Sequence, residues 1–225
     1  MSQFFDDADA VARYAEGPRR LVPGHDALLT MSEVLLAERL AETASLLVIG
    51  AGGGLEMAHF AQSHPQWHFT GVDPSAKMLA LAASTMGALA DRATLINGYA
   101  SDAPHGPFDA ATCLLTLHFV PVTEKLATLN SIRARLKPGA PFVIAHHSVP
   151  GDAVEREQWF LRFAAFGTRS GVFAGNAHAA ATRIAAELPI LSPQEDEALL
   201  VQAGFNPVRQ FYAAFTFRGW VCAAV

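Results

Sequence analysis

The sequence predicts an α/β protein with a mostly parallel seven-stranded sheet, helices on both faces, a helical cap and an antiparallel hairpin at its C-terminal end. Strand-like and helical segments alternate between residues 25 and 147, which is typical of a parallel sheet. The last two β-rich runs follow each other too closely for a crossover helix, so they must pair antiparallel. With 225 residues, 51% hydrophobic and 16% charged, the chain can bury one large core.

The elements of the parallel part follow from periodicity and from helix-ending residues. Continuous apolar runs such as "SLLVIG" predict strands that are buried on both faces, and apolar residues three or four apart predict helices. Pro74 fits the first turn of a helix, and "KPG" ends one. The expected order is a helix over 25–40, a strand over 45–50, a helix over 55–64, a strand over 68–73, a helix over 74–86, strands over 93–97 and 108–116, a helix over 123–136 and a strand over 141–147.

Residues 152–188 contain no strand-like run, and they are too long for an ordinary connection. We expect them to form a helical cap over the carboxyl edge of the sheet. Aromatic residues recur there at helical spacing, which favours core packing or a dimer interface over an aromatic acceptor pocket. They are Trp159, Phe160, Phe163 and Phe166.

The chain then ends in a helix entered through Ser192 and Pro193 and in the hairpin "VRQFYAAF" and "TFRGWVCAAV". We therefore predict one domain over residues 1–225, with N-terminal helices in 1–44 and the cap as an insertion.

Composition excludes several classes of protein. A net charge of −5 and the lack of a Lys/Arg run argue against binding to a nucleic-acid backbone. No apolar stretch is long enough for a bilayer, and "MSQFFDDADA" is acidic where a signal peptide is basic. Cys113 and Cys222 lie in apolar strand-like segments, which predicts buried thiols in a reducing cytoplasm rather than a disulfide.

The run "LLVIGAGGG" at residues 46–54 predicts a strand followed by a glycine-rich turn. Glycines at Gly50 and Gly52 would let the backbone approach a ligand closely. The sixth position counted from Gly50 is Leu55, so the G-x-G-x-x-G pattern of dinucleotide enzymes is absent. The alternative is a tight strand-to-helix turn that binds nothing.

Asp73 closes the next strand, where an acid can accept hydrogen bonds from both hydroxyls of a ribose. The same acid could instead cap the helix that follows it, and the two roles are compatible. Since it would suit NAD as well, the missing third glycine and the terminal hairpin are what argue against a dehydrogenase.

Successive segments of the chain resemble the motifs of class I S-adenosylmethionine (SAM)-dependent methyltransferases. These segments are "LLVIGAGGG", "GVDPSAKML", "FDAATCLLTLHFVP", "LKPGAPFVIAHHS" and "LVQAGF…FTFRGWVCAAV". Within that superfamily, "VPGHDALLTMSEVLLAERL" and "TLHFVP" resemble the carboxy-SAM synthase group, which serves tRNA wobble-uridine modification.

The resemblance implies SAM as the cofactor, S-adenosylhomocysteine as the product and a set of contact residues. Those contacts are His25, Gly50, Ala51, Gly52, Asp73, Pro74, Tyr99, Ala100, Leu114 and Leu115.

Three positions depart from the family pattern. Val48 replaces an acid before the turn, so the amino group of the ligand needs another anchor, with backbone carbonyls as one candidate. Tyr99 stands where an acid reads the adenine amino group, so either Asp102 substitutes or Tyr99 stacks on the ring. Leu114 replaces an Asn of the carboxy-SAM group.

His118, after the fourth strand, is the candidate catalytic base, with pocket lining or helix capping as the alternative. His25, His118, His146 and His147 do not predict a metal site, because adjacent residues of a strand point to opposite faces.

We expect a cytoplasmic SAM-dependent methyltransferase that acts on a small-molecule acceptor, dimerises through the cap and binds neither nucleic acid nor membrane. One alternative is a carboxy-SAM synthase that uses SAM and prephenate, and another is a non-catalytic SAM-binding protein.

Two residues favour methyl transfer over carboxy-SAM synthesis. The carboxy-SAM group places a cap arginine against the new carboxylate, at a position that falls on Ala181 here. Arg183, two residues along, points about 200° away on a helix. The aromatic hydroxyl that follows "VPG" in that group is replaced by His25.

Overall fold

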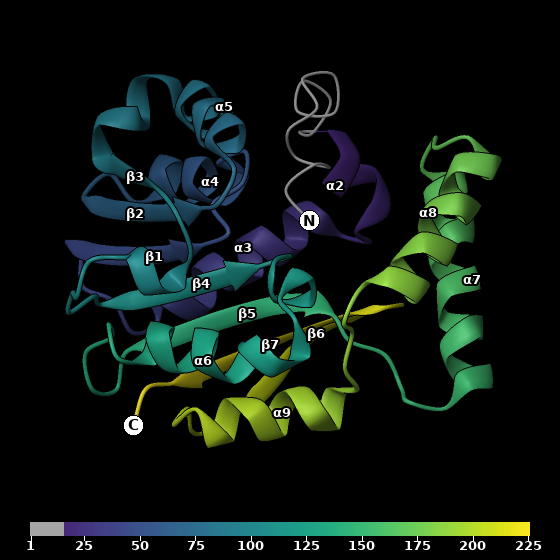
Figure 1. Ribbon diagram of the computed structural model, residues 1–225. Coiled ribbons are helices and arrows are strands. Elements are labelled where there is room, and N and C mark those ends of the chain that lie inside the picture. The colour runs from purple at the N-terminus through teal and green to yellow at the C-terminus, as the bar shows by residue number, and fades with distance from the viewer. Residues whose placement is uncertain (1–15) are drawn as a thin grey trace.

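The computed structural model describes residues 16–225, and in that part of the chain a seven-stranded sheet forms the centre of the fold (Figure 1). The strand order is β3-β2-β1-β4-β5-β7-β6. The strands are β1 (Ala44–Ile49), β2 (Trp67–Asp73), β3 (Ala93–Asn97), β4 (Ala110–Leu114), β5 (Pro141–His147), β6 (Arg209–Ala214) and β7 (Phe217–Ala223).

Strands β1 to β5 are parallel, whereas β7 runs antiparallel to both β5 and β6. The predicted hairpin is therefore confirmed. Its register on β5 extends from Pro141 opposite Ala223 to His147 opposite Phe217.

Helices cover both faces of the sheet (Figure 1). One face packs against α3, α4 and α5, and the other against α6 and α9. The helices are α2 (Glu16–Leu21), α3 (His25–Ala37), α4 (Leu55–Ser63), α5 (Ala76–Met86), α6 (Val122–Arg133), α7 (Ala153–Arg169), α8 (Ala174–Glu187) and α9 (Pro193–Gln202).

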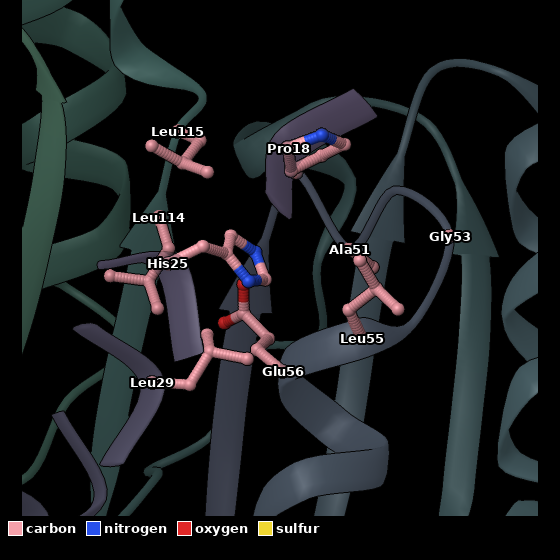
Figure 2. Close-up of a pocket in the computed structure, with 10 residues that line it drawn as sticks. Pro18, His25, Leu29, Ala51, Gly53, Leu55, Glu56, Leu114 and Leu115 are labelled. Carbon is pink, nitrogen blue, oxygen red and sulfur yellow. The ribbon is translucent and has the colours of Figure 1, made fainter. Parts of the chain in front are cut away.

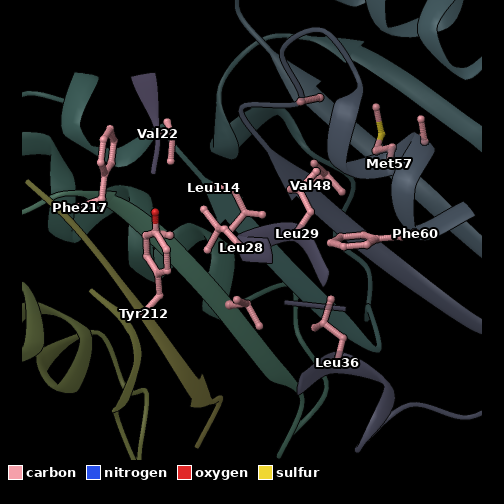
Figure 3. Packing of buried hydrophobic residues seen from close by; sticks show 14 of the residues in the cluster. Val22, Leu28, Leu29, Leu36, Val48, Met57, Phe60, Leu114, Tyr212 and Phe217 are labelled. Atoms are coloured by element: carbon pink, nitrogen blue, oxygen red, sulfur yellow. The ribbon is translucent and has the colours of Figure 1, made fainter. Parts of the chain in front are cut away.

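The alternation of side chains along β1 divides the core into two layers. Leu46 and Val48 pack on the side of α3 and α4, where Figure 3 shows Val48 beside Leu29. Leu47 and Ile49 pack on the side of α6. A continuous apolar run is needed because both faces of this parallel strand are buried.

Several boundaries differ from the prediction, and two of them have a clear local cause. Helix α5 begins at Ala76, because the hydroxyl of Ser75 accepts the N–H of Met78 at 3.3 Å and so caps the helix. Pro74 lies before that cap and is not part of the helix. Strand β4 ends at Leu114, since Leu115 takes the left-handed conformation with φ of 56°.

Helices α2 and α3 lie within the predicted N-terminal helical segment, while residues 1–15 of that segment fall outside the described part of the chain. Within residues 16–225, no helix has both the length and the apolar character needed to cross a bilayer.

The segment predicted as a cap contains α7 and α8, which pack side by side beyond the ends of β5 and β7 (Figure 1). Phe163 is 1% exposed, and its ring lies 5.5 Å from that of His147 and 6.0 Å from that of Phe217. The side chain of Phe163 therefore packs within its own chain, which agrees with core packing, one of the two roles expected for the cap aromatics. The homodimer stays a prediction.

We predict that Gly54→Ala lowers the free energy of unfolding by about 1–3 kcal/mol, measured by urea denaturation. Gly54 has φ of 78°, and an added Cβ would lie 2.8 Å from the Cα of Ala82 on α5. Gly151→Ala is the matched control, because nothing lies within 4 Å of its added Cβ. Equal effects of the two substitutions would mean that the close approach of Gly54 to α5 does not add to the loss of stability.

Candidate cofactor-binding site

A cavity of about 560 Å³, here called the large cavity, lies at the carboxyl ends of β1, β2, β3 and β4. The connection that leaves β1 leads to β2 on one side, and the connection that leaves its neighbour β4 leads to β5 on the other side. Open α/β sheets bind ligands at such a reversal of strand order. Many of the predicted contacts line this cavity, namely Gly50, Gly52, Asp73, Pro74, Tyr99, Ala100 and Leu115. One side of α6 forms a wall that the sequence did not reveal, through Glu124, Ala127, Thr128 and Ser131.

The glycine turn follows β1 directly. The N–H groups of Gly50 and Ala51 both donate to the carbonyl of Val72 on β2, at 2.9 and 3.0 Å. Gly50 has φ of 72°, and an added Cβ would overlap the side chain of Thr116. The fold by itself therefore requires glycine at position 50, and the case for a ligand rests on the cavity and on Asp73.

Asp73 joins the end of β2 to the glycine turn. Its Oδ2 accepts the N–H of Gly52 and its Oδ1 accepts the N–H of Ser75, both at 2.9 Å. Burial raises the pKa of this carboxyl, and the two backbone hydrogen bonds oppose that rise. Since Ser75 caps α5, the interpretation of Asp73 as the helix cap is wrong. Each oxygen keeps a second lone pair with which to accept a ligand hydroxyl.

At the end of β3, Tyr99 is 70% exposed and borders the large cavity. Asp102 Oδ2 accepts the N–H of Tyr99 at 2.7 Å, and Asp102 is not among the described residues that line the cavity. The hypothesis that Asp102 reads the ligand base therefore gains no support, whereas Tyr99 stays available as a surface for stacking.

A second, smaller cavity of about 30 Å³ shares two lining residues, Gly50 and Leu115, with the first. Figure 2 shows the residues around this smaller cavity. We call it the small cavity. Three further predicted contacts line it, namely His25, Ala51 and Leu114. The remaining lining is Pro18, Leu29, Gly53, Leu55 and Glu56.

Leu115 lies between the two cavities with φ of 56°, which is strained for a side chain of this size. Its N–H donates to the carbonyl of Ala145 at 2.6 Å, and this bond holds the conformation. Strain of this kind is concentrated at functional sites.

Glu56, in the first turn of α4, is the residue of the small cavity that sequence reasoning missed. It is 7% exposed, and burial raises its pKa to about 8. The hydroxyl of Thr112 donates to Oε1 at 2.5 Å, and no described residue forms an ion pair with the carboxylate. The available signal was an acid within the otherwise apolar run "GLEMAHF".

His25 faces the same cavity and is 5% exposed. Its Nδ1 lies 3.0 Å from Asp26 Oδ1. Burial lowers the pKa of His25, and the contact with Asp26 only partly offsets this effect. Its imidazole is therefore neutral at physiological pH.

His118 does not line either cavity in the described part of the chain. It is 4% exposed, its Nδ1 accepts the N–H of His147 at 3.2 Å, and burial holds its pKa well below the usual value. The structure thus gives His118 a core position and does not support its role as a base. Its neighbour Phe119 borders the large cavity instead.

His146 and His147 point to opposite faces of β5, as predicted. The ring of His146 lies 5.5 Å from that of Trp220, and the ring of His147 stacks on Phe217 at 4.0 Å. The described residues contain no group of three or more side chains placed to hold a metal ion.

Comparison with protein families matches residues 47–142 to a methyltransferase domain. This range runs from Leu47 in β1 through the glycine turn, β2, β3 and β4 to the start of β5. It includes the carboxyl ends of β1 to β4, where the large cavity lies. Residues 47–142 therefore match a methyltransferase domain. SAM is accordingly its cofactor.

The chain is also similar to individual proteins over most of its length. The chain is 26% identical to the carboxy-S-adenosyl-L-methionine synthase of Chromohalobacter salexigens over 228 residues, covering 98% of this chain and 83% of that protein. An O-methyltransferase family protein from Burkholderia thailandensis has a TM-score of 0.71 at 16% identity, over 99% of this chain and 62% of that one. An O-methyltransferase family 2 protein from Planctomyces limnophilus has a TM-score of 0.61 at 15% identity, over 90% and 61%. The chain spans about three fifths of these two structures, which show a shared fold.

The residues present fit SAM. A volume of about 560 Å³ is in the usual range for a cofactor of this size. The buried carboxylate of Asp73 opens onto that volume, and it is suited to a pair of ribose hydroxyls. Gly50 also lines the small cavity, together with His25 and Glu56.

We predict that Glu56→Gln stabilises the protein increasingly as pH rises from 5 to 8, by about 2–5 kcal/mol at the upper end. The folded chain keeps the Glu56 proton up to a pKa of about 8, whereas a carboxyl at its usual 4.5 loses it earlier. The wild type therefore loses stability across this window, and the amide does not.

Urea unfolding at several pH values measures this difference. Glu42→Gln supplies the matched charge change at an exposed side chain that accepts a hydrogen bond from Gln66. A stability gain from Glu56→Gln that stays constant from pH 5 to pH 8 would contradict the raised pKa.

Proposed function

We propose that this protein transfers the methyl group of SAM to a small-molecule acceptor and releases S-adenosylhomocysteine. The small cavity is the observation that supports this reaction. Its described lining contains one carboxylic acid, Glu56, one neutral imidazole, His25, and no Lys or Arg. Such a lining favours cationic and apolar groups and disfavours an additional carboxylate.

Bound SAM supplies a methyl group on a cationic sulfonium, which makes the transfer itself favourable. The task left to the protein is alignment and exclusion of water. We propose that Asp73 accepts hydrogen bonds from the ribose hydroxyls of SAM. The backbone of Gly50 and Gly52 would contact the part of SAM that links the ribose to the methionine. Leu114 and Leu115 supply apolar surface where methyl and acceptor would meet.

Carboxy-SAM synthesis is the alternative that the relative from Chromohalobacter salexigens favours. Ala181, at the position of the expected arginine, is 3% exposed on α8, and Arg183 lies on the exposed side of that helix. Helix α8 contributes no residue to the described lining of either cavity. These positions support methyl transfer, because a new carboxylate would lack its cation.

The location and the partners are inferred from simpler observations. Cys113 and Cys222 are free and buried, which supports a reducing cytoplasm. A net charge of −5 supports a small acceptor over a nucleic acid.

We predict that Asp73→Ala weakens S-adenosylhomocysteine binding by about 2–3 kcal/mol, measured by calorimetry. The alanine removes the acceptor for the ribose hydroxyls and also frees the N–H of Gly52. Asp91→Ala, at an exposed position of the 3-10 helix Gly87–Arg92, should leave the affinity unchanged. Tight binding of NAD by the wild type with none of S-adenosylhomocysteine would refute the cofactor assignment.

We also predict that incubation with SAM and prephenate yields no carboxylated nucleotide, as measured by mass spectrometry. The reason is that the described residues lining the small cavity include no Lys or Arg to pair with a carboxylate. A parallel reaction without prephenate is the control. A product heavier by one carboxylate, lost in Arg183→Ala, would establish carboxy-SAM synthesis instead.

A further inference from the structure

Glu56 is a buried acid that forms no ion pair with any residue in the described range 16–225. It is 7% exposed, and Thr112, whose hydroxyl donates to Oε1, is fully buried on β4. Glutamine could accept the same hydrogen bond without the cost of burying an ionisable carboxyl. An acid kept in such a place at the expense of stability indicates a binding role.

The carboxyl group of Glu56 extends from α4 toward the neighbouring strands β1 and β4. Thr112 is the register partner of Val48 on β1, so the side chains of both residues lie on the α4 side of the sheet. Glu56 reaches from α4 to Thr112 and thereby places a carboxyl beside Val48, just below the glycine turn. Figure 2 shows its oxygens directed toward His25 in the small cavity.

The size of the small cavity limits what Glu56 can meet there. A volume of about 30 Å³ accommodates one or two groups the size of a water molecule. The small cavity shares Gly50 and Leu115 with the lining of the large one. We therefore infer that a ligand whose ribose lies at Asp73 places its other end in the small cavity. The occupant is then the end of that ligand farthest from the ribose. It must be compact to fit the volume, and a positively charged hydrogen-bond donor would match Glu56.

We propose that Glu56 binds the ammonium group of the methionine end of SAM and S-adenosylhomocysteine, and that Thr112 positions its carboxylate. This inference rests on the proposed cofactor. The ammonium is compact, cationic and a donor of three hydrogen bonds. This ion pair would offset the cost of burying the carboxylate, which has no cationic partner among residues 16–225.

Two probes isolate this contact by calorimetry. S-adenosylhomocysteine has the ammonium and no sulfonium, whereas 5′-methylthioadenosine lacks the whole amino-acid end. We expect Glu56→Gln to raise the Kd of S-adenosylhomocysteine roughly 10- to 100-fold and to change that of 5′-methylthioadenosine less than about twofold. Glu42→Gln, with the same charge change outside both cavities, should alter neither Kd.

Each other outcome overturns a distinct statement. Unchanged binding of S-adenosylhomocysteine by Glu56→Gln would eliminate the contact while leaving the proposed cofactor intact. Equal weakening of both probes would show that Glu56 supports the shape of the whole site and not the ammonium. With SAM titrated as a third ligand, weaker binding of SAM and unchanged binding of S-adenosylhomocysteine would assign Glu56 to the sulfonium. A wild type that binds neither probe would overturn the proposed function together with this inference.

Discussion

The carboxylate of Asp73 fixes the geometry on which the site depends. By accepting the N–H of Gly52 and that of Ser75, it ties the turn after β1 to the end of β2 and to the approach of α5. The same group faces the large cavity with lone pairs to spare. One buried acid therefore organises the backbone around the cofactor and offers the cofactor its acceptors, because a carboxylate has more acceptor positions than the two backbone donors use.

A second buried acid gives the other end of the site its character. Glu56 makes the small cavity anionic when it is ionised, while the neutral state of His25 adds no opposing charge. Because the pKa of Glu56 is raised to about 8, only a minor fraction of the free protein has this carboxyl ionised near neutral pH. A cationic ligand group would favour the ionised form, so ligand binding and the ionisation of Glu56 are linked. The burial of the Glu56 carboxyl thus favours ligands with a cationic group over neutral or anionic ligands.

Much of the site could be predicted from local sequence. Gly50, Gly52 and Asp73 follow from the glycine spacing and from strand ends that converge on one edge of a parallel sheet. The family resemblance added Pro74, Tyr99 and Ala100, and all six residues border the large cavity. His118 shows where this reasoning stops. Position after a strand predicts the edge of the sheet, and Phe119 does face the cavity, but a short helix over Leu117–Phe119 turns His118 into the core.

The sequence by itself determined the parallel sheet, the terminal hairpin and the cofactor class, since these follow from periodicity, loop length and a local motif. Only the tertiary structure decided which buried polar groups belong to the site. Glu56 and Thr112 are 56 positions apart, and α6 reaches the large cavity from beyond β4. Their contacts depend on how helices pack across the sheet, and no local pattern encodes that packing because each helix shows only which of its own faces is apolar.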